Sequence, residues 1–281
     1  MKTAEEIFEF IISLYEVDGS FERWTDYRKR ITEYLISKMD EGKTVAILGV
    51  GEANDLDLSK IHSHVSKLTL VDIDLEKIKK ATRKYGLEGS NKISIVQADF
   101  VGITKKDYVS AIAPVRRDIV KNKQFFSPYV SGPKYLQVIN QILEHVNSHS
   151  IELGIDEHDY VIAIGVHSQL FGLLERPWDL LMHSIGKTGE AYSPIIKRVI
   201  EQNNVFMPKF NDAILAKSKE KAFIGLEQLE LERNVCPNGA MQAQSDIYEK
   251  IPRENHVVYM DVWSYRDGLT YQMGINVINK M

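Results

Sequence analysis

Cysteine is nearly absent from this sequence: Cys236 is the only one among 281 residues. A single thiol cannot form a disulfide within the chain, and it cannot supply the thiolates of a structural zinc site. Cysteine usage of this kind fits a reducing compartment. We therefore expect a cytoplasmic protein without an internal disulfide, and the spacing of its histidines suggests no metal site.

Long apolar runs and a surplus of basic residues are missing as well. No segment is apolar over the roughly 20 residues that a membrane-spanning helix needs. The N-terminal residues 1–6 are acidic where a secretory signal would be basic. The formal net charge of −4 argues against a broad nucleic-acid-binding surface. The sequence therefore favours a small-molecule partner over a membrane or a nucleic acid, and it leaves homo-oligomer formation open.

Two common motifs of catalytic and phosphate-binding sites do not occur. The sequence has no Gly-x-Ser-x-Gly turn for a serine nucleophile, and it lacks the full Gly-x-x-x-x-Gly-Lys-Ser/Thr pattern of a phosphate loop. These absences argue against a serine hydrolase and against a nucleoside triphosphatase of the phosphate-loop type.

The sequence does contain an ordered series of strand and helix patterns between Thr44 and Phe100. Short β-rich apolar runs occur at 44–48, 68–71 and 93–96, and helical patterns separate them. This alternation predicts three neighbouring parallel strands of a nucleoside-binding half-sheet.

Polar or glycine residues stand where each of these strands ends. The first strand enters the turn Gly49-Val50-Gly51, where the glycines let the backbone approach a ligand closely. The second ends at Asp72, whose carboxylate can accept hydrogen bonds from both hydroxyls of a ribose. The third ends at Asp99, which can accept a hydrogen bond from an adenine amino group. Three strand ends are therefore predicted to contact one nucleoside.

Three segments of the chain resemble the successive motifs of class I S-adenosylmethionine-dependent methyltransferases. They are the first strand with its glycine turn, Val71-Asp72-Ile73-Asp74, and Gln97-Ala98-Asp99-Phe100. The resemblance implies S-adenosyl-L-methionine as cofactor and S-adenosyl-L-homocysteine as product. It also implies that the glycine turn passes the methionine part, that the second strand holds the ribose and that the third meets adenine. The residues that it assigns to the cofactor, with the end of the fourth strand included, are Gly49, Val50, Gly51, Glu52, Asp72, Ile73, Asp99, Phe100 and Gly165.

Two positions depart from the pattern of that family. An acidic residue is common two places before the first glycine, where this chain has Ile47, and the usual third glycine is Ala53. Glu52, Asn54 or Asp55 is expected to take over part of the binding of the methionine end. Asn54 or Asp55 could instead be the N-cap of the next helix.

The remainder of the chain predicts a Rossmann-like α/β fold, a three-layer sandwich around a mostly parallel seven-stranded sheet. Further strands are expected at 160–165, 221–226, 257–263 and 269–278. Asp267-Gly268 predicts the turn of an antiparallel C-terminal hairpin. We expect an N-terminal helical cap over residues 1–42 and the methyltransferase domain over 43–281, with helical insertions near 101–156 and 167–219.

Catalytic and acceptor-binding residues are predicted from position alone. Methyl transfer needs a general base only when the acceptor must lose a proton. The candidate for this base is His167, which lies just past Gly165. The alternative is that His167 has a structural hydrogen-bonding role. The acceptor is expected to be small or medium-sized. Aromatic residues proposed to line its pocket, or else to belong to the core, are Tyr27, Phe171, Trp178 and Tyr192.

Two other functions stay open at this point. The same half-sheet binds the cofactor of NAD(P)-dependent oxidoreductases, which also carry an acidic residue after the second strand. The chain could also be a non-catalytic module that keeps the fold for cofactor or partner binding.

Overall fold

The computed structural model describes residues 2–122, 125–187 and 193–280. The chain divides into two compact units, which we call the helical unit and the sheet unit. The helical unit comprises residues 1–16, 101–150 and 169–206, and the sheet unit comprises residues 17–100, 151–168 and 207–281. The predicted boundary at 42/43 differs from this division and stays a prediction.

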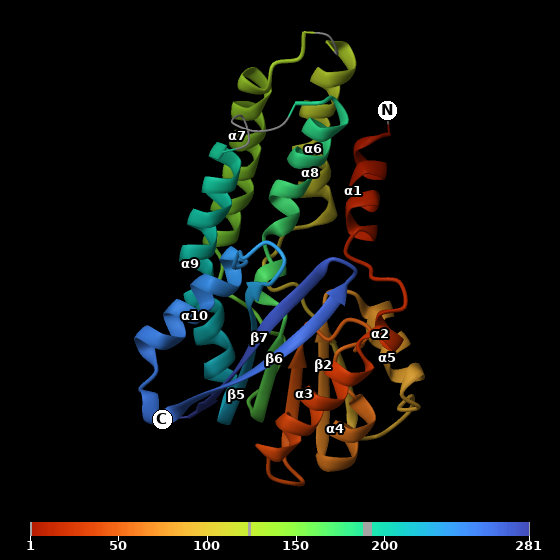
Figure 1. Ribbon diagram of the computed structural model, residues 1–281, viewed down its shortest axis with the longest axis vertical. Helices are drawn as coiled ribbons and strands as arrows, with labels where there is room; N and C mark the ends of the chain where they lie inside the picture. The colour runs from red at the N-terminus through yellow and green to blue at the C-terminus, as the bar shows by residue number, and fades with distance from the viewer. Residues whose placement is uncertain (1, 123–124, 188–192, 281) are drawn as a thin grey trace. The chain divides into compact units, whose positions relative to one another are not determined.

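A seven-stranded sheet forms the centre of the sheet unit (Figure 1). The strand order is β3-β2-β1-β4-β5-β7-β6; the pairs among β3, β2, β1, β4 and β5 are parallel, whereas β7 pairs antiparallel with β5 and β6. This confirms the expected Rossmann-like sheet with its C-terminal hairpin. The strands are β1 Thr44–Leu48, β2 Lys67–Asp72, β3 Ile93–Gln97, β4 His158–Ile164, β5 Ser218–Glu230, β6 His256–Arg266 and β7 Leu269–Asn279.

One face of this sheet is covered by α3 (Thr25–Ser37), α4 (Leu58–His64) and α5 (Leu75–Lys84). Apolar side chains at helical spacing, such as Ile31 and Leu35 of α3, share a buried cluster with alternate residues of the strands. The short α2 (Ser20–Arg23) precedes α3. Burial of these apolar side chains explains why α3, which has many charged residues, is helical and is fixed against the sheet.

The other face of the sheet carries α10 (Asn238–Lys250) and a buried polar pair. Asn276 of β7 is fully buried and lies between the core residues Ile275 and Val277, so its side chain points to the opposite face. Its amide exchanges two 2.9 Å hydrogen bonds with Gln244 of α10 and also donates to the Ile224 carbonyl. Every polar atom of the Asn276 side chain therefore has a partner.

The helical unit contains α1 (Ala4–Ser13), α6 (Lys105–Lys121), α7 (Pro128–Asn147), α8 (Gly172–Ser184) and the first part of α9 (Ser193–Lys217). Helix α6 contacts α1, α7 and α8 (Figure 1). Pro128 is the first residue of α7, where a missing N–H costs no hydrogen bond, and Pro133 lies within the helix.

Candidate functional site

Asp72, at the carboxyl end of β2, connects the ends of three strands. The carboxylate accepts a 2.8 Å hydrogen bond from the Gly51 N–H at Oδ2 and a 2.9 Å bond from the Asp74 N–H at Oδ1. The Asp72 carbonyl accepts from the Ala98 N–H, which fixes the end of β3 beside it. The glycine turn and the two acidic strand ends are therefore contiguous, as the motif order predicted.

Each Asp72 oxygen accepts one backbone hydrogen bond and can accept another, since an ionised carboxylate offers about four lone-pair sites. The residue as a whole is 9% exposed, and its two backbone donors hold the carboxylate in one orientation. This is the geometry that a pair of ligand hydroxyls would require.

The turn after β1 has an unusual backbone. Gly49, Gly51 and Ala53 adopt positive φ angles of 65°, 50° and 49°. A Cβ on Gly49 would lie 2.7 Å from Cγ2 of Val166, whereas a Cβ on Gly51 would meet no atom within 4 Å. Gly49 is therefore required by close packing inside the protein, and Gly51 faces open space. Ala53 keeps the left-handed conformation although it replaces the third glycine.

Two basic side chains hold the loop that follows this turn. Arg28 of α3 is buried and donates to the carbonyls of Phe21 and Asn54. Lys84 of α5 donates to the Glu52 carbonyl and to the Asn54 side chain. The loop is therefore fixed from two helices of the same face of the sheet.

Asn54 and Asp55 are not the N-cap of the next helix. That role belongs to Asp57, whose carboxylate accepts from the N–H groups of Ser59 and Lys60. The N-cap alternative for Asn54 or Asp55 is therefore wrong, because the helix begins at Leu58 with Asp57 as its N-cap.

Asp55 lies in the same loop, and burial raises the pKa of its carboxyl to about 6, against the nearby positive charges of Lys84 and Arg28. An unfolded aspartate titrates near pH 4. Between these values the folded protein binds the proton more tightly than the unfolded chain, so this group makes folding less favourable as the pH rises.

We therefore expect Asp55→Asn to become more stable relative to the unchanged protein as the pH rises from 4 to 6. The gain should reach about 1–3 kcal/mol and stay constant above pH 7, since a tenfold difference in proton affinity corresponds to roughly 1.4 kcal/mol. Urea unfolding of both proteins at several pH values measures it. A stability difference that does not change with pH would contradict the expectation.

The residues around the ends of β2 and β3 offer an apolar surface beside Asp72. Ile73 is 54% exposed although it directly follows a buried strand residue. Its carbonyl accepts a 2.9 Å hydrogen bond from the Gln97 side chain. Asp99 and Phe100 are half-buried, and the Phe100 ring lies 5.4 Å from that of Phe210. Exposed apolar atoms next to acceptor oxygens suit the flat face and polar edge of an aromatic base.

The carboxyl end of β4 lies next to that of β5, where sequence reasoning missed several residues. A Cβ on Gly165 would be 3.6 Å from Oε1 of Glu227 and 3.8 Å from the Trp263 ring. Glu227 is buried, and its Oε1 accepts a 2.9 Å hydrogen bond from Ser168. The sequence predicted that the fifth strand stops at Leu226, but β5 continues to Glu230, so Glu227 is part of the strand.

His167 is fully buried in the sheet unit. Asn211 donates its amide N–H groups to Ala243 and Asp246, so its Oδ1 accepts from the His167 Nε2–H at 3.0 Å. Burial lowers the pKa of His167 to about 4, so the ring is neutral at pH 7. Its Nδ1 then carries a lone pair and has no partner among the described residues. Its role as a base stays a prediction.

The aromatic residues predicted for an acceptor pocket fall into both units. Tyr27 belongs to the sheet unit and is buried, with its ring stacked on Trp263 at 5.2 Å. Phe171 and Trp178 belong to the helical unit and are buried there; Trp178 packs against Tyr135. Tyr192 lies outside the described residues.

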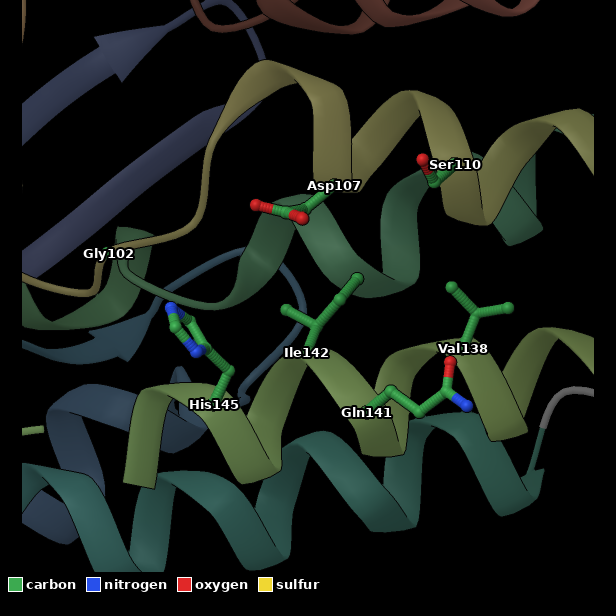
Figure 2. A pocket seen from close by; sticks show the side chains of 7 residues that line it. All are labelled: Gly102, Asp107, Ser110, Val138, Gln141, Ile142 and His145. Carbon is green, nitrogen blue, oxygen red and sulfur yellow. The ribbon is translucent and has the colours of Figure 1, made fainter. Parts of the chain in front are cut away.

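A small cavity lies between α6 and α7 of the helical unit (Figure 2). Asp107, one of its residues, also accepts hydrogen bonds from Thr104 as part of the capping box of α6. Figure 2 shows His145 near Gly102, and Gln141 on the part of α7 that precedes His145. The residues that line the cavity are Gly102, Asp107, Ser110, Val138, Gln141, Ile142 and His145.

The described part of the chain has neither a metal cluster nor a membrane-spanning helix. No group of three or more histidine, cysteine, aspartate or glutamate residues in ranges 2–122, 125–187 and 193–280 is arranged to hold a metal ion. Within the same ranges, no helix has both the length and the apolar character that crossing a membrane requires.

Comparisons with known proteins found similar solved structures but no matching family model or curated protein. Similar solved structures include N-methyltransferase NodS from Bradyrhizobium japonicum WM9 in complex with S-adenosyl-l-homocysteine, with 11% identity, a TM-score of 0.46 and 99% of each chain covered.

Two other solved structures are also similar to this chain. Magnesium protoporphyrin IX methyltransferase from Synechocystis PCC 6803 with bound SAH has 10% identity, a TM-score of 0.45 and coverage of 94% of this chain and 88% of that chain. A putative RNA methyltransferase from Pyrococcus horikoshii has 12% identity, a TM-score of 0.44 and coverage of 100% and 98%.

Proposed function

We propose that this chain is an S-adenosylmethionine-dependent methyltransferase that methylates a small or medium-sized acceptor. The observation that carries the proposal is the Asp72 carboxylate, oriented by the Gly51 and Asp74 N–H groups and still able to accept from two hydroxyls. Asp72 receives the ribose, and Asp99 with the exposed Ile73 receives adenine. The open space at Gly51 admits the chain that leads from the ribose to the sulfur.

S-adenosylmethionine supplies a sulfonium methyl group that an acceptor atom can take by in-line displacement. The protein then has to orient the acceptor and exclude water from the site. Glycine at 49 and 51 permits close approach of the backbone, and Gly165 leaves room at the end of β4. A base is required only for an acceptor that must lose a proton, and for that case His167 remains the proposed residue. The cytoplasmic location also remains a prediction.

Titration of the purified chain with S-adenosylhomocysteine and, separately, with NADH tests the proposal. We expect S-adenosylhomocysteine to bind with one-to-one stoichiometry by calorimetry and NADH to give no saturable signal. Binding of NADH alone would overturn the proposal in favour of an oxidoreductase. Binding of S-adenosylhomocysteine without transfer of a labelled methyl group to any component of a small-molecule extract would favour a non-catalytic binding module.

A further inference from the structure

Three residues that pack near the carboxyl ends of β4 and β5 each have a buried polar atom without a hydrogen-bond partner within the described part of the chain. These atoms are Oη of Tyr27, Oε2 of Glu227 and Nε1 of Trp263. The rings of Tyr27 and Trp263 stack at an interplanar angle of 11°. Glu227 and Trp263 both lie within 4 Å of one point, the position that a Cβ on Gly165 would take.

Leaving such groups unpaired is costly. A buried polar atom without a hydrogen bond costs on the order of 1–3 kcal/mol, and a buried unpaired carboxylate costs more. Burial raises the pKa of Glu227, even though its other oxygen accepts from Ser168. The pKa of Tyr27 is raised as well, mainly by burial and to a smaller extent by the nearby carboxylates of Asp55 and Glu227. Such an arrangement gains most from a ligand that brings a positive charge and hydrogen-bond donors.

The surrounding rings also favour a cation. Trp24 contacts Trp263 edge to face, and Tyr27 stacks on the same indole. The faces of tyrosine and tryptophan attract positively charged groups. No lysine or arginine donates to Oε2 of Glu227 within the described ranges. The charge that would complement Glu227 is therefore not supplied by the described residues.

The cluster adjoins the site proposed for the cofactor. Gly165 is followed by Val166, whose Cγ2 lies 2.7 Å from the place of a Cβ on Gly49. Gly165 itself is fixed by a 2.9 Å hydrogen bond from its N–H to the Gly225 carbonyl. The polar cluster therefore lies beside Gly165, and the glycine turn lies beside the next residue, Val166.

We propose that Glu227, Tyr27 and Trp263 form a binding site for a protonated amino group. The ammonium donates to Oε2 of Glu227 and to the Tyr27 hydroxyl oxygen, beside the stacked rings of Tyr27 and Trp263. The Trp263 N–H donates to an acceptor atom of the same ligand. This inference rests on the proposed function, because the ammonium belongs either to the amino-acid part of the methyl donor or to an amine acceptor.

The variant Glu227→Gln separates charge from shape, since glutamine keeps an oxygen that can accept from Ser168. The two probes are S-adenosylhomocysteine and 5′-methylthioadenosine, which lacks the amino-acid part. If the donor's ammonium binds here, the variant should bind S-adenosylhomocysteine at least tenfold more weakly and methylthioadenosine unchanged. Calorimetry measures both affinities. Tyr27→Phe, which removes only the hydroxyl, should weaken S-adenosylhomocysteine in the same direction by a smaller factor.

An amine acceptor gives a different pattern. In that case Glu227→Gln binds S-adenosylhomocysteine as tightly as the original protein does. The amine probe n-butylammonium then binds to the original protein when S-adenosylhomocysteine is already bound, and it does not bind to Glu227→Gln under the same conditions. Butanol, which has the same shape without the charge, should not bind to either. Both patterns support the ammonium site, and they identify its source.

Glu230→Gln is the matched control, because Glu230 lies on the same strand and is buried but is paired with Arg233. It should not change either affinity. The ammonium site is overturned if Glu227→Gln leaves the binding of both S-adenosylhomocysteine and n-butylammonium unchanged, or if it tightens S-adenosylhomocysteine binding. Failure of the unchanged protein to bind S-adenosylhomocysteine would instead count against the proposed function. Urea unfolding should show that Glu227→Gln is folded and at least as stable as the unchanged protein, since the variant removes a buried charge.

Discussion

Replacing Asp72 by alanine is expected to lower the affinity for S-adenosylhomocysteine by a factor of about 100 or more. Two charge-assisted hydrogen bonds to ribose hydroxyls are lost, each on the order of 1.5–3 kcal/mol, and tenfold in affinity corresponds to about 1.4 kcal/mol. The variant also leaves the Gly51 and Asp74 N–H groups without their acceptor. Calorimetric titration measures the affinity, and urea unfolding measures the accompanying loss of stability.

Two further variants show whether the loss comes from the ribose contact. Asp72→Asn keeps one acceptor oxygen, but its amide turns hydrogen-bond donors toward the Gly51 or Asp74 N–H, so we expect it to bind almost as poorly as Asp72→Ala. Asp74→Ala is the control two residues away. Asp74 is the N-cap of α5, so its removal should cost about 1 kcal/mol of stability and leave the affinity within a factor of about three. Equal affinities of Asp72→Ala and the unchanged protein would show that Asp72 does not hold the ribose.

The second large effect is expected from Gly51→Ala. The added methyl group meets no protein atom within 4 Å, so the cost to folding is limited to the positive φ of 50°, about 1–2 kcal/mol. Ala53 already adopts a similar φ in the same loop. The methyl group would, however, occupy the space proposed for the ligand, and we expect the affinity for S-adenosylhomocysteine to fall at least tenfold.

Gly89→Ala provides the matched comparison. Gly89 has a φ of 78°, and a Cβ there would also meet no atom within 4 Å, but the residue lies between α5 and β3, away from the proposed ligand. The two variants should lose similar stability in urea unfolding, and only Gly51→Ala should lose affinity. If the affinity is unchanged in Gly51→Ala, the open space beside this glycine is not part of the cofactor site.

The sequence predicted the sheet and the contacts of its first strand ends well, because these features are local. A β-rich run followed by a glycine turn or an acidic residue places that residue at a strand end, and parallel pairing brings the ends together. The 2.8 Å contact between Gly51 and Asp72 follows from this logic. The C-terminal hairpin was likewise indicated by Asp267-Gly268 between two β-rich runs.

Burial and long-range partners could not be predicted in the same way. His167 follows β4 as expected, but it is fully buried and its hydrogen-bond partner Asn211 lies 44 residues later in the chain. The sequence pattern places Glu227 beyond the end of a strand, although β5 extends past it and the side chain packs near Trp263. Its neighbours come from segments far apart in sequence, and periodicity carries no information about which segments meet.

The amide pair between Gln244 and Asn276 constrains how this protein can be redesigned. A C-terminal hairpin from another sheet protein that carries an apolar residue at the position of Asn276 would leave the Gln244 Nε2 buried without its acceptor, although Gln228 still donates to the Gln244 Oε1. A chimera must therefore exchange α10 and the hairpin together. The same coupling means that recombination between related chains should be tolerated before Asn238 and not between Lys250 and Leu269.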